Sequence, residues 1–448
     1  MVNSLKEYLE IAKAKGWVLA IKEKVYREDI PALIEKLSWE GKILLFENVK
    51  GYSCQLIANL VPSHDVFRIL FDTENPYDYF IKGVQRTEKK VRVTEKKLKH
   101  IEVSGKNLLD LLPLLKHYEK DSAPFITTGI VSSVDPDSGI VGRGIHRMEY
   151  RGKNLLGVAL LNPPLTTIYE KYKSRGKRMP VAITIGVDPA LFISMALKVP
   201  PGTDKLEVAG GLRGKGIEVM PTPQGGIEVP TAGELLLEGY IDETRGKKDG
   251  PMGEISGYYL SLQETPTIVV EHLYFRDSPI YHALLPTSQE ADRYLTFVSR
   301  AHLEESAKKL FSFIVNITFV PKTFGSSLVV QVMTSEKFKI RNLIIFLLSF
   351  PMVKKVVIVD DDVNADDPYD VEWAVITRCK ADDDFIIINK LQGQPIDPTA
   401  EDVYGVTKIG INATIQGKSI EERAKVTKGN IKRIRDVMSK IRREVLNG

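Results

Sequence analysis

The part of the sequence that most limits the fold is the segment from about Pro124 to Tyr281. It is a series of short apolar or β-branched runs separated by Pro and Gly at turn positions, which is typical of a β-barrel or β-sandwich. Two stretches inside it have a helical pattern, TIYEKYKSRG and DPALFISMAL. We therefore expect the middle of the chain to be a barrel or sandwich that carries two inserted helices.

The flanking segments are predicted to mix helices and strands. Residues 1 to about 110 contain a helical pattern near 3–15, followed by a strand, a second helix and a second strand. From Glu304 onward strands and helices alternate, which favours an α/β layer, and a cationic helix is predicted at the C-terminus. At roughly 100–200 residues per domain, we predict three domains, with boundaries 1–115, 116–310 and 311–448.

The charge and cysteine content exclude several classes of protein. The 62 Lys and Arg residues nearly balance the 58 Asp and Glu residues, so no nucleic-acid or membrane-surface partner is indicated. Cys54 and Cys379 lie far apart and form no CxxC motif, which points to a reducing cytoplasm. The longest apolar run, Leu343–Met352, is about half of the roughly 20 residues that a membrane span needs, so we expect a buried core element and no membrane span.

Several familiar catalytic motifs are absent from the sequence: GxGxxG after a strand, the P-loop, GxSxG and HExxH. What stands out is a Gly-Pro-Met-Gly turn flanked by two acids, Asp249 and Glu254. The turn can bring both carboxylates toward one point, with the guanidinium of Arg147 between them, and two acids of unequal environment suit an acid/base step. A turn flanked by acids can equally be an ordinary surface turn, and the residues alone leave this open.

A set of motifs in one order carries a resemblance to a known family. The motifs are GIVSSVDPDSGIVGRGIHRM, TIGVDPALF, LEVAGGLRGKGIEVM, VPTAGELLLEGYI, DGPMGEISGYY, VVIVDDDVNADDPYDVEWAVITR, PIDPTA and IGINAT. Together they resemble the UbiD family of prenylated-flavin (prFMN) dependent decarboxylases. The match runs from about Pro124 to Arg423, and the N-terminal third fits in size and pattern only.

The resemblance implies a fold, an activity and partners. The fold would be an N-terminal α/β domain, a split β-barrel flavin-binding domain and a C-terminal α/β domain whose last helix helps to form a homo-oligomer. Family members are carboxy-lyases that remove CO2 from α,β-unsaturated or aromatic carboxylic acids through a covalent adduct between substrate and prFMN. The cofactor would come from a flavin prenyltransferase of the UbiX type.

The resemblance also implies roles for individual residues. Arg147 matches the family's catalytic arginine, and Ile145, His146 and Arg147 would line the flavin. Glu254 matches the proton donor. Asp249 stands where the family usually has Glu, one methylene longer, and Arg147 would orient the carboxylate and keep Asp249 ionised.

The family's metal site is not matched in this sequence. Relatives hold the flavin phosphate through a divalent cation bound by Asn, His and Glu, and the corresponding positions here are Gly142, the Pro164/Leu165 pair and Lys205. None of these can serve as the expected ligand, and a lysine would repel a divalent ion. We therefore expect no conventional Mn or Mg site.

Two hypotheses follow from this departure. In the first, the protein is a decarboxylase in which Lys205, with Arg143, contacts the flavin phosphate directly. In the second, flavin and metal binding have been lost, and the chain is a non-catalytic subunit or binding protein that keeps Arg147 and Glu254 as a structural ion pair.

Plainer interpretations of the remaining candidates stay open. Arg143 is then a solvated loop residue, Lys205 a surface lysine and His146 a packed or hydrogen-bonded ring. His282 and Glu290 are candidates to face a substrate pocket. The identity of the substrate is not predicted.

Overall fold

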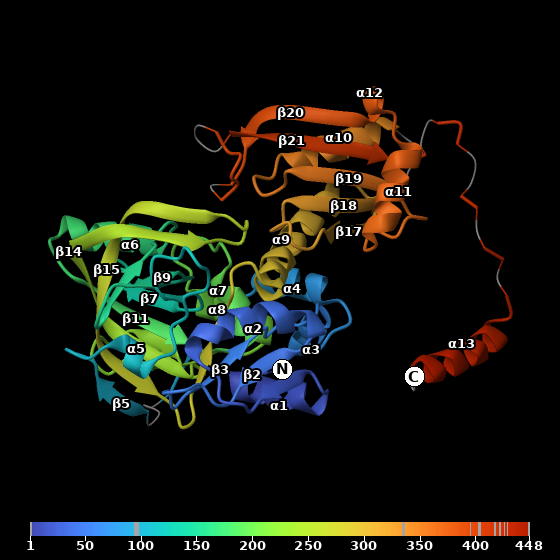
Figure 1. Cartoon of the computed structure of the whole chain (residues 1–448). Coiled ribbons are helices and arrows are strands. Elements are labelled where there is room, and N and C mark those ends of the chain that lie inside the picture. The colour runs from blue at the N-terminus through green and yellow to red at the C-terminus, as the bar shows by residue number, and fades with distance from the viewer. Residues whose placement is uncertain are drawn as a thin grey trace.

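The computed structural model describes most of the chain. Its described residues are 2–93, 98–333, 337–394, 396–401, 405–415, 418–420, 423–424, 426–427 and 429–446. Helices and strands both occur along the chain, and the strands form one curled sheet and further sheets covered by helices. The predicted mixed α/β and β fold is therefore confirmed (Figure 1). Among these residues no helix is both long and apolar enough to cross a bilayer.

The N-terminal part forms a four-stranded sheet with helices around it. The elements in chain order are α1 (Leu5–Ala14), β1 (Val18–Ile21), η1 (Arg27–Asp29), α2 (Ile30–Leu37), η2 (Ser38–Glu40), β2 (Ile43–Phe46), β3 (Gln55–Ala58), α3 (Asp65–Phe71) and α4 (Pro76–Val84). Helix α1 starts at Ser4, whose side chain accepts a hydrogen bond from the Glu7 N–H, and it buries one face of the helix. The sheet order is β1-β2-β3-β16, where β16 (Ile280–His282) comes from far along the chain.

The central part is a nine-stranded antiparallel sheet that curls into a half-barrel (Figure 1). Its strands and attached helices are β5 (Lys99–Glu102), α5 (Leu108–Leu111), β6 (Phe125–Ile126), β7 (Ile130–Val134), β8 (Val141–Ile145), β9 (Met148–Tyr150), β10 (Leu155–Val158), α6 (Leu165–Ser174), β11 (Met179–Ile185), α7 (Pro189–Met195), α8 (Lys205–Arg213), β14 (Leu235–Gly253) and β15 (Tyr259–Phe275). Helices α6 and α7 lie at the two predicted insertions. A separate three-stranded sheet joins β4 (Val91–Arg92), β12 (Glu218–Pro221) and β13 (Glu228–Pro230).

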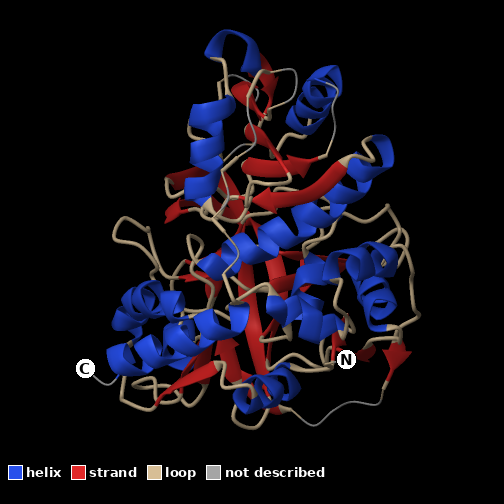
Figure 2. Cartoon of the chain, turned by 90° about the vertical axis from the view of Figure 1, so that its right-hand side faces the viewer, coloured by secondary structure: helices blue, strands red, loops and turns tan. Residues whose placement is uncertain are grey.

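The C-terminal part is a five-stranded sheet with helices on both faces (Figure 2). Helix α9 (Gln289–Leu310) leads into it. The other elements are β17 (Ile314–Phe319), β18 (Ser327–Val332), α10 (Lys337–Leu348), β19 (Lys355–Asp360), α11 (Pro368–Arg378), α12 (Ala381–Asp384), β20 (Phe385–Gln392), β21 (Gly405–Ala413) and α13 (Ile431–Leu446). The apolar run predicted to be buried lies largely in α10, where Leu343, Ile344 and Leu347 are fully buried.

The hydrophobic cores do not follow the predicted division into three. One cluster joins Leu44 and Leu56 of the N-terminal sheet to Ile183 and Leu237 of the central sheet, so these two parts share a core. The C-terminal sheet has its own clusters, and α9 contributes Leu303 to one of them. The boundaries at 115 and 310 stay predictions.

A close backbone approach fixes α8 against the segment after α4. A Cβ added at Gly211 would lie 2.2 Å from the Arg86 carbonyl oxygen and 2.8 Å from that of Gly83. Because backbone atoms cannot move aside as a flexible side chain can, α8 has to carry glycine at this position.

We predict that Gly211→Ala lowers the free energy of unfolding by about 1–3 kcal/mol, because the methyl group forces α8 away from residues 83–86. Urea unfolding measures this change. Gly405→Ala is the control, since its Cβ would meet the nearest neighbour at 3.5 Å, an ordinary contact. Equal effects of the two substitutions would contradict the prediction.

Candidate active site

Arg147 lies between two carboxylates that come from another part of the central sheet. It follows β8 by two residues, whereas Asp249 lies in β14 and Glu254 directly follows that strand. The Arg147 Nη2 donates to Asp249 Oδ1 at 2.5 Å, and Nη1 donates to Glu254 Oε1. Asp249 is fully buried and Arg147 is 11% exposed. The predicted grouping of these three residues around the Gly-Pro-Met-Gly turn is therefore present in the fold.

Two further acids hold the turn in place from outside. Asp121 Oδ1 accepts a hydrogen bond from the Gly253 N–H at 2.8 Å, and Glu149 Oε1 accepts one from the Gly250 N–H at 3.2 Å. Backbone groups of the 249–254 turn are thus fixed by side chains of neighbouring segments. This fixes the direction in which both flanking carboxylates point.

Burial sets the proton affinity of the two acids. It raises the pKa of Glu254 above its ordinary value, although Arg147 acts in the opposite sense and the charge of Asp249 adds to the rise. Burial also raises the pKa of Asp249, again against the effect of Arg147. The loss of hydration thus outweighs the ion pair in its effect on the pKa of Asp249, and the expectation that Arg147 keeps Asp249 ionised stays a prediction. Both acids can hold a proton above the usual range.

Two polar atoms of this network have no hydrogen-bond partner among the described residues. They are Nε of Arg147 and Oδ2 of Asp249, and both are buried. A buried donor or acceptor without a partner raises the free energy of the folded protein. A bound molecule that forms hydrogen bonds with these two atoms would therefore gain binding free energy. The free Nε suits an acceptor such as a carboxylate oxygen.

Two family models match the chain. The model described as the 3-octaprenyl-4-hydroxybenzoate carboxy-lyase Rift-related domain of UbiD covers residues 87–289, and the model of the C-terminal domain covers 294–413. The curated anhydromevalonate phosphate decarboxylase of Methanosarcina mazei is 33% identical over 379 residues, which are 83% of this chain and 87% of that protein. The chain belongs to the UbiD family. This confirms the predicted family and its class of enzyme, the carboxy-lyases.

Other UbiD relatives agree in length and fold. The anhydromevalonate phosphate decarboxylase of Methanocaldococcus jannaschii is 30% identical over 400 residues, 87% of this chain and 93% of that protein. The structure of the UbiD-class enzyme HmfF from Pelotomaculum thermopropionicum in complex with FMN matches with a TM-score of 0.89 at 28% identity, covering 97% of this chain and 99% of that chain. The matched fold is thus one in which a flavin binds.

The residues at the positions where metal ligands were expected from the resemblance have other surroundings in the structure. A Cβ added at Gly142 would lie 2.4 Å from Cδ1 of Ile168 and 3.1 Å from Cγ of Pro164, so α6 and the residue before it fill the place where a side chain would stand. The third position is Lys205, a cation. Within the described residues no group of three or more His, Cys, Asp and Glu is placed to hold a metal ion.

Lys205 is a buried lysine and not a surface one. It is the first residue of α8, its side chain is directed inward, and its Nζ donates to the carbonyl oxygen of Met195 at 2.7 Å. Burial lowers the pKa of the Lys205 ammonium to about 8. The alternative that Lys205 is an ordinary surface residue is therefore wrong.

His146 is the hydrogen-bonded ring that the sequence suggested. Its Nδ1 lies 2.8 Å from the carbonyl oxygen of Ala159. Burial lowers the pKa of His146, the bond to Ala159 opposes this, and the nearby charge of Lys205 lowers it further. Ile145 ends β8 and is half-buried. The predicted contacts of Ile145, His146 and Lys205 with a flavin stay predictions.

Arg143 differs from both interpretations that the sequence allowed. It is fully buried in β8, where its Nε and Nη2 donate to the two carboxylate oxygens of Asp204 at 2.8 and 3.1 Å, and its Nη1 donates to the Ser132 hydroxyl at 3.0 Å. It is neither a solvated loop residue nor directed at a free site. Because its guanidinium is taken up by Asp204, we leave Arg143 out of the proposed cofactor site.

His282 and Glu290 bind each other in the interior. His282 Nε2 and Glu290 Oε1 are 2.9 Å apart, and both side chains are 1% exposed. The pair joins β16 to α9, so it fixes a helix to the N-terminal sheet. A contact of either residue with substrate stays a prediction.

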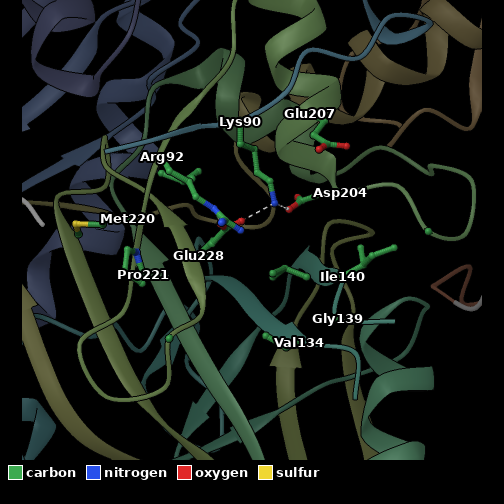
Figure 3. Close-up of a pocket in the computed structure, with 14 residues that line it drawn as sticks. Lys90, Arg92, Val134, Gly139, Ile140, Asp204, Glu207, Met220, Pro221 and Glu228 are labelled. Atoms are coloured by element: carbon green, nitrogen blue, oxygen red, sulfur yellow. Dashed lines mark hydrogen bonds and ion pairs between the residues drawn. The ribbon is translucent and has the colours of Figure 1, made fainter. Parts of the chain in front are cut away.

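A cavity of about 630 Å³ is lined by none of the three catalytic candidates; Figure 3 shows its lining. Its charged lining residues are Lys90, Arg92, Asp204, Glu207 and Glu228. Lys90 bridges Asp204 at 2.9 Å and Glu228 at 2.6 Å, so charges on its wall already neutralise each other. Neither Arg147 nor Lys205 lines this cavity.

Sequence reasoning missed the residues that support the site. Asp121, Glu149 and Asp204 make the bonds that orient the turn and α8, but each stands among ordinary polar residues in the sequence. The signal for Asp204 was local, since an aspartate directly before an apolar helical pattern is a good N-cap. Asp121 and Glu149 carry no such signal.

We predict that the free energy of unfolding of the native protein falls more between about pH 4 and pH 8 than that of Glu254→Gln. The raised pKa of Glu254 means that the folded state binds its proton more tightly than the unfolded state. This stabilisation is full below the ordinary pKa and is lost as pH rises through the raised value. Urea unfolding at both pH values measures it, and an equal or steeper fall for Glu254→Gln would contradict the raised pKa.

Proposed function

We propose that the chain is a prFMN-dependent decarboxylase of an α,β-unsaturated or aromatic carboxylic acid. The observation that supports this most is the Arg147 network, with two acids of raised pKa and a buried Nε that lacks a partner. An arginine with a free donor suits a substrate carboxylate. Membership of the UbiD family supplies the reaction class.

Each residue of the network has a role in this proposal. Arg147 binds the substrate carboxylate and places it for loss of CO2. Glu254, which retains its proton above the usual range, delivers it to the carbon that CO2 leaves. Asp249 holds the guanidinium of Arg147 in position, and its side chain is one methylene shorter than the glutamate usual in the family.

The cofactor site of the proposal lies beside this network. Ile145, His146 and Arg147 would line the flavin, and Lys205 follows Asp204, which pairs with Arg143 of the same strand, β8, that Ile145 ends. When bound, prFMN supplies the electron sink for decarboxylation, and the protein supplies orientation and the proton. A flavin prenyltransferase would provide the cofactor.

The relatives suggest the first substrate to test. The curated proteins at 30–33% identity are named as anhydromevalonate phosphate decarboxylases, so a phosphorylated unsaturated acid of this kind belongs first in an assay. We propose the cytoplasm as its compartment, in keeping with two free cysteines.

We predict that Glu254→Gln lowers kcat for decarboxylation by roughly 10²- to 10⁴-fold, because the group that delivers the proton is lost. The enzyme is produced together with a flavin prenyltransferase, and CO2 release from anhydromevalonate phosphate and from a panel of unsaturated and aromatic acids is measured. Glu264→Gln, an exposed acid in β15, is the control and should leave kcat unchanged.

The alternative function predicts another outcome. A non-catalytic UbiD-like subunit or binding protein that has lost flavin and metal binding would carry no flavin and release no CO2 from any acid even when well folded, and the Gln variant would behave like the native protein. That result would replace the proposed decarboxylase by the alternative.

We further propose that α13 joins copies of the chain into a homo-oligomer. Figure 1 shows this helix standing apart from the sheets. Its exposed apolar residues recur on one helical face: Ile431, Ile434, Val437, Met438 and Ile441, between 46% and 64% exposed. Burial of this apolar face requires a complementary surface, and in a homo-oligomer a second copy of the chain provides it.

We predict that the double substitution Ile434→Asp and Ile441→Asp shifts the protein to smaller species, because charges on the apolar face prevent its burial. Size-exclusion chromatography with light scattering measures the mass. Lys432→Ser, on the opposite face of α13, is the control and should leave the mass unchanged. A native protein that is already monomeric would contradict the oligomer.

A further inference from the structure

The buried ammonium of Lys205 is a charge without an acidic partner. Lys205 is 8% exposed, and no carboxylate of the described residues pairs with it. Among the described residues, Lys205 Nζ donates a hydrogen bond to the carbonyl oxygen of Met195. An ammonium has three N–H donors, so this leaves donors for a further acceptor.

Lys408 is a second buried lysine without an acidic partner among the described residues, but its Nζ donates to two carbonyl oxygens, whereas several other buried cations face carboxylates. Buried guanidinium and ammonium groups that face carboxylates form the pairs Arg143–Asp204, Arg213–Asp188, Arg378–Asp360 and Lys418–Asp384. Taking an unpaired charge out of water is costly unless another charge or several hydrogen bonds replace the lost hydration. For Lys205, one carbonyl oxygen replaces the lost hydration.

The position of Lys205 connects it to the proposed active site. Asp204, the residue directly before Lys205, accepts hydrogen bonds from Arg143 of β8, and β8 ends two residues before Arg147, so the start of α8 is fixed against the strand that leads to the proposed catalytic arginine. Lys205 is also the first residue of the nine-residue helix α8, whose N-terminal end is already capped by the Asp204 carboxylate. The charge left to compensate is therefore the ammonium of Lys205.

A metal ion cannot be that compensation. The ammonium repels divalent cations, and Ile168 and Pro164 occupy the space above Gly142 where another ligand would have to stand. What suits the site is an anion. Building on the proposed function, we propose that Lys205 takes the place of the family's divalent metal and binds the phosphate monoester of the flavin directly, through its own N–H donors.

The test compares two flavins that differ only in the phosphate. FMN and riboflavin are titrated into the full-length protein in buffer containing EDTA, and quenching of flavin fluorescence gives each Kd. The native protein should bind FMN roughly 10- to 100-fold more tightly than riboflavin without metal, as expected for charge-assisted bonds to a phosphate. In Lys205→Met this preference should disappear, while the riboflavin Kd stays within about twofold.

Lys408 provides the matched control. It is also a fully buried lysine, and its Nζ donates to two carbonyl oxygens, of Leu348 and Phe350, in the C-terminal part. Lys408→Met should therefore keep the full preference for FMN. Unchanged riboflavin binding shows that each variant is folded, and Lys205→Gln serves as a second variant of similar length.

The possible outcomes separate the inference from the proposed function. If FMN preference survives in Lys205→Met and Lys205→Gln, or is abolished in the native protein by EDTA, the assignment to Lys205 is overturned and the flavin site stands. If neither flavin binds the native protein, the proposed function fails and this inference with it. If Lys205→Met raises KM for a phosphorylated acid while FMN affinity is unchanged, the ammonium binds the substrate phosphate and the assignment is again overturned.

Discussion

The ion pairs of Arg147 with Asp249 and Glu254 are the interaction on which the rest of the site depends. They join the end of β8 to the turn that ends β14, segments about a hundred residues apart in the sequence. Because both acids lose hydration, their pKa values rise despite the guanidinium between them. In the proposed reaction, Arg147 of this arrangement would bind the anion and Glu254 would hold the proton that replaces CO2.

Asp204 has a similar role at the start of the neighbouring helix α8, because one carboxylate connects several segments. Asp204 accepts hydrogen bonds from Arg143 of β8, from Lys90 beside β4 and from the Leu206 N–H of α8. It therefore fixes the first turn of α8, and with it the direction of Lys205. A carboxylate that looks like a simple helix cap thus holds three segments together and leaves the adjacent ammonium without an acid of its own.

Much of this could be predicted from the sequence where the pattern is local. The inserted helices, the buried run in α10 and the acids around the Gly-Pro-Met-Gly turn follow from apolar periodicity and turn chemistry. The burial of Arg143 could not be predicted, because its partner Asp204 lies 61 residues away. The same holds for β16, which pairs with β3 of a distant segment. For Asp249, the charge of Arg147 could be foreseen, but the stronger effect of burial on its pKa depends on the packed structure.

The central claim is that this UbiD-family chain is a flavin enzyme built on the Arg147 network. The most direct measurement is a native mass spectrum with a visible absorption spectrum of the protein produced together with a flavin prenyltransferase, and a metal assay on the same sample. The account predicts one prFMN per chain without a stoichiometric divalent metal. A well-folded protein that carries no flavin under these conditions would contradict it.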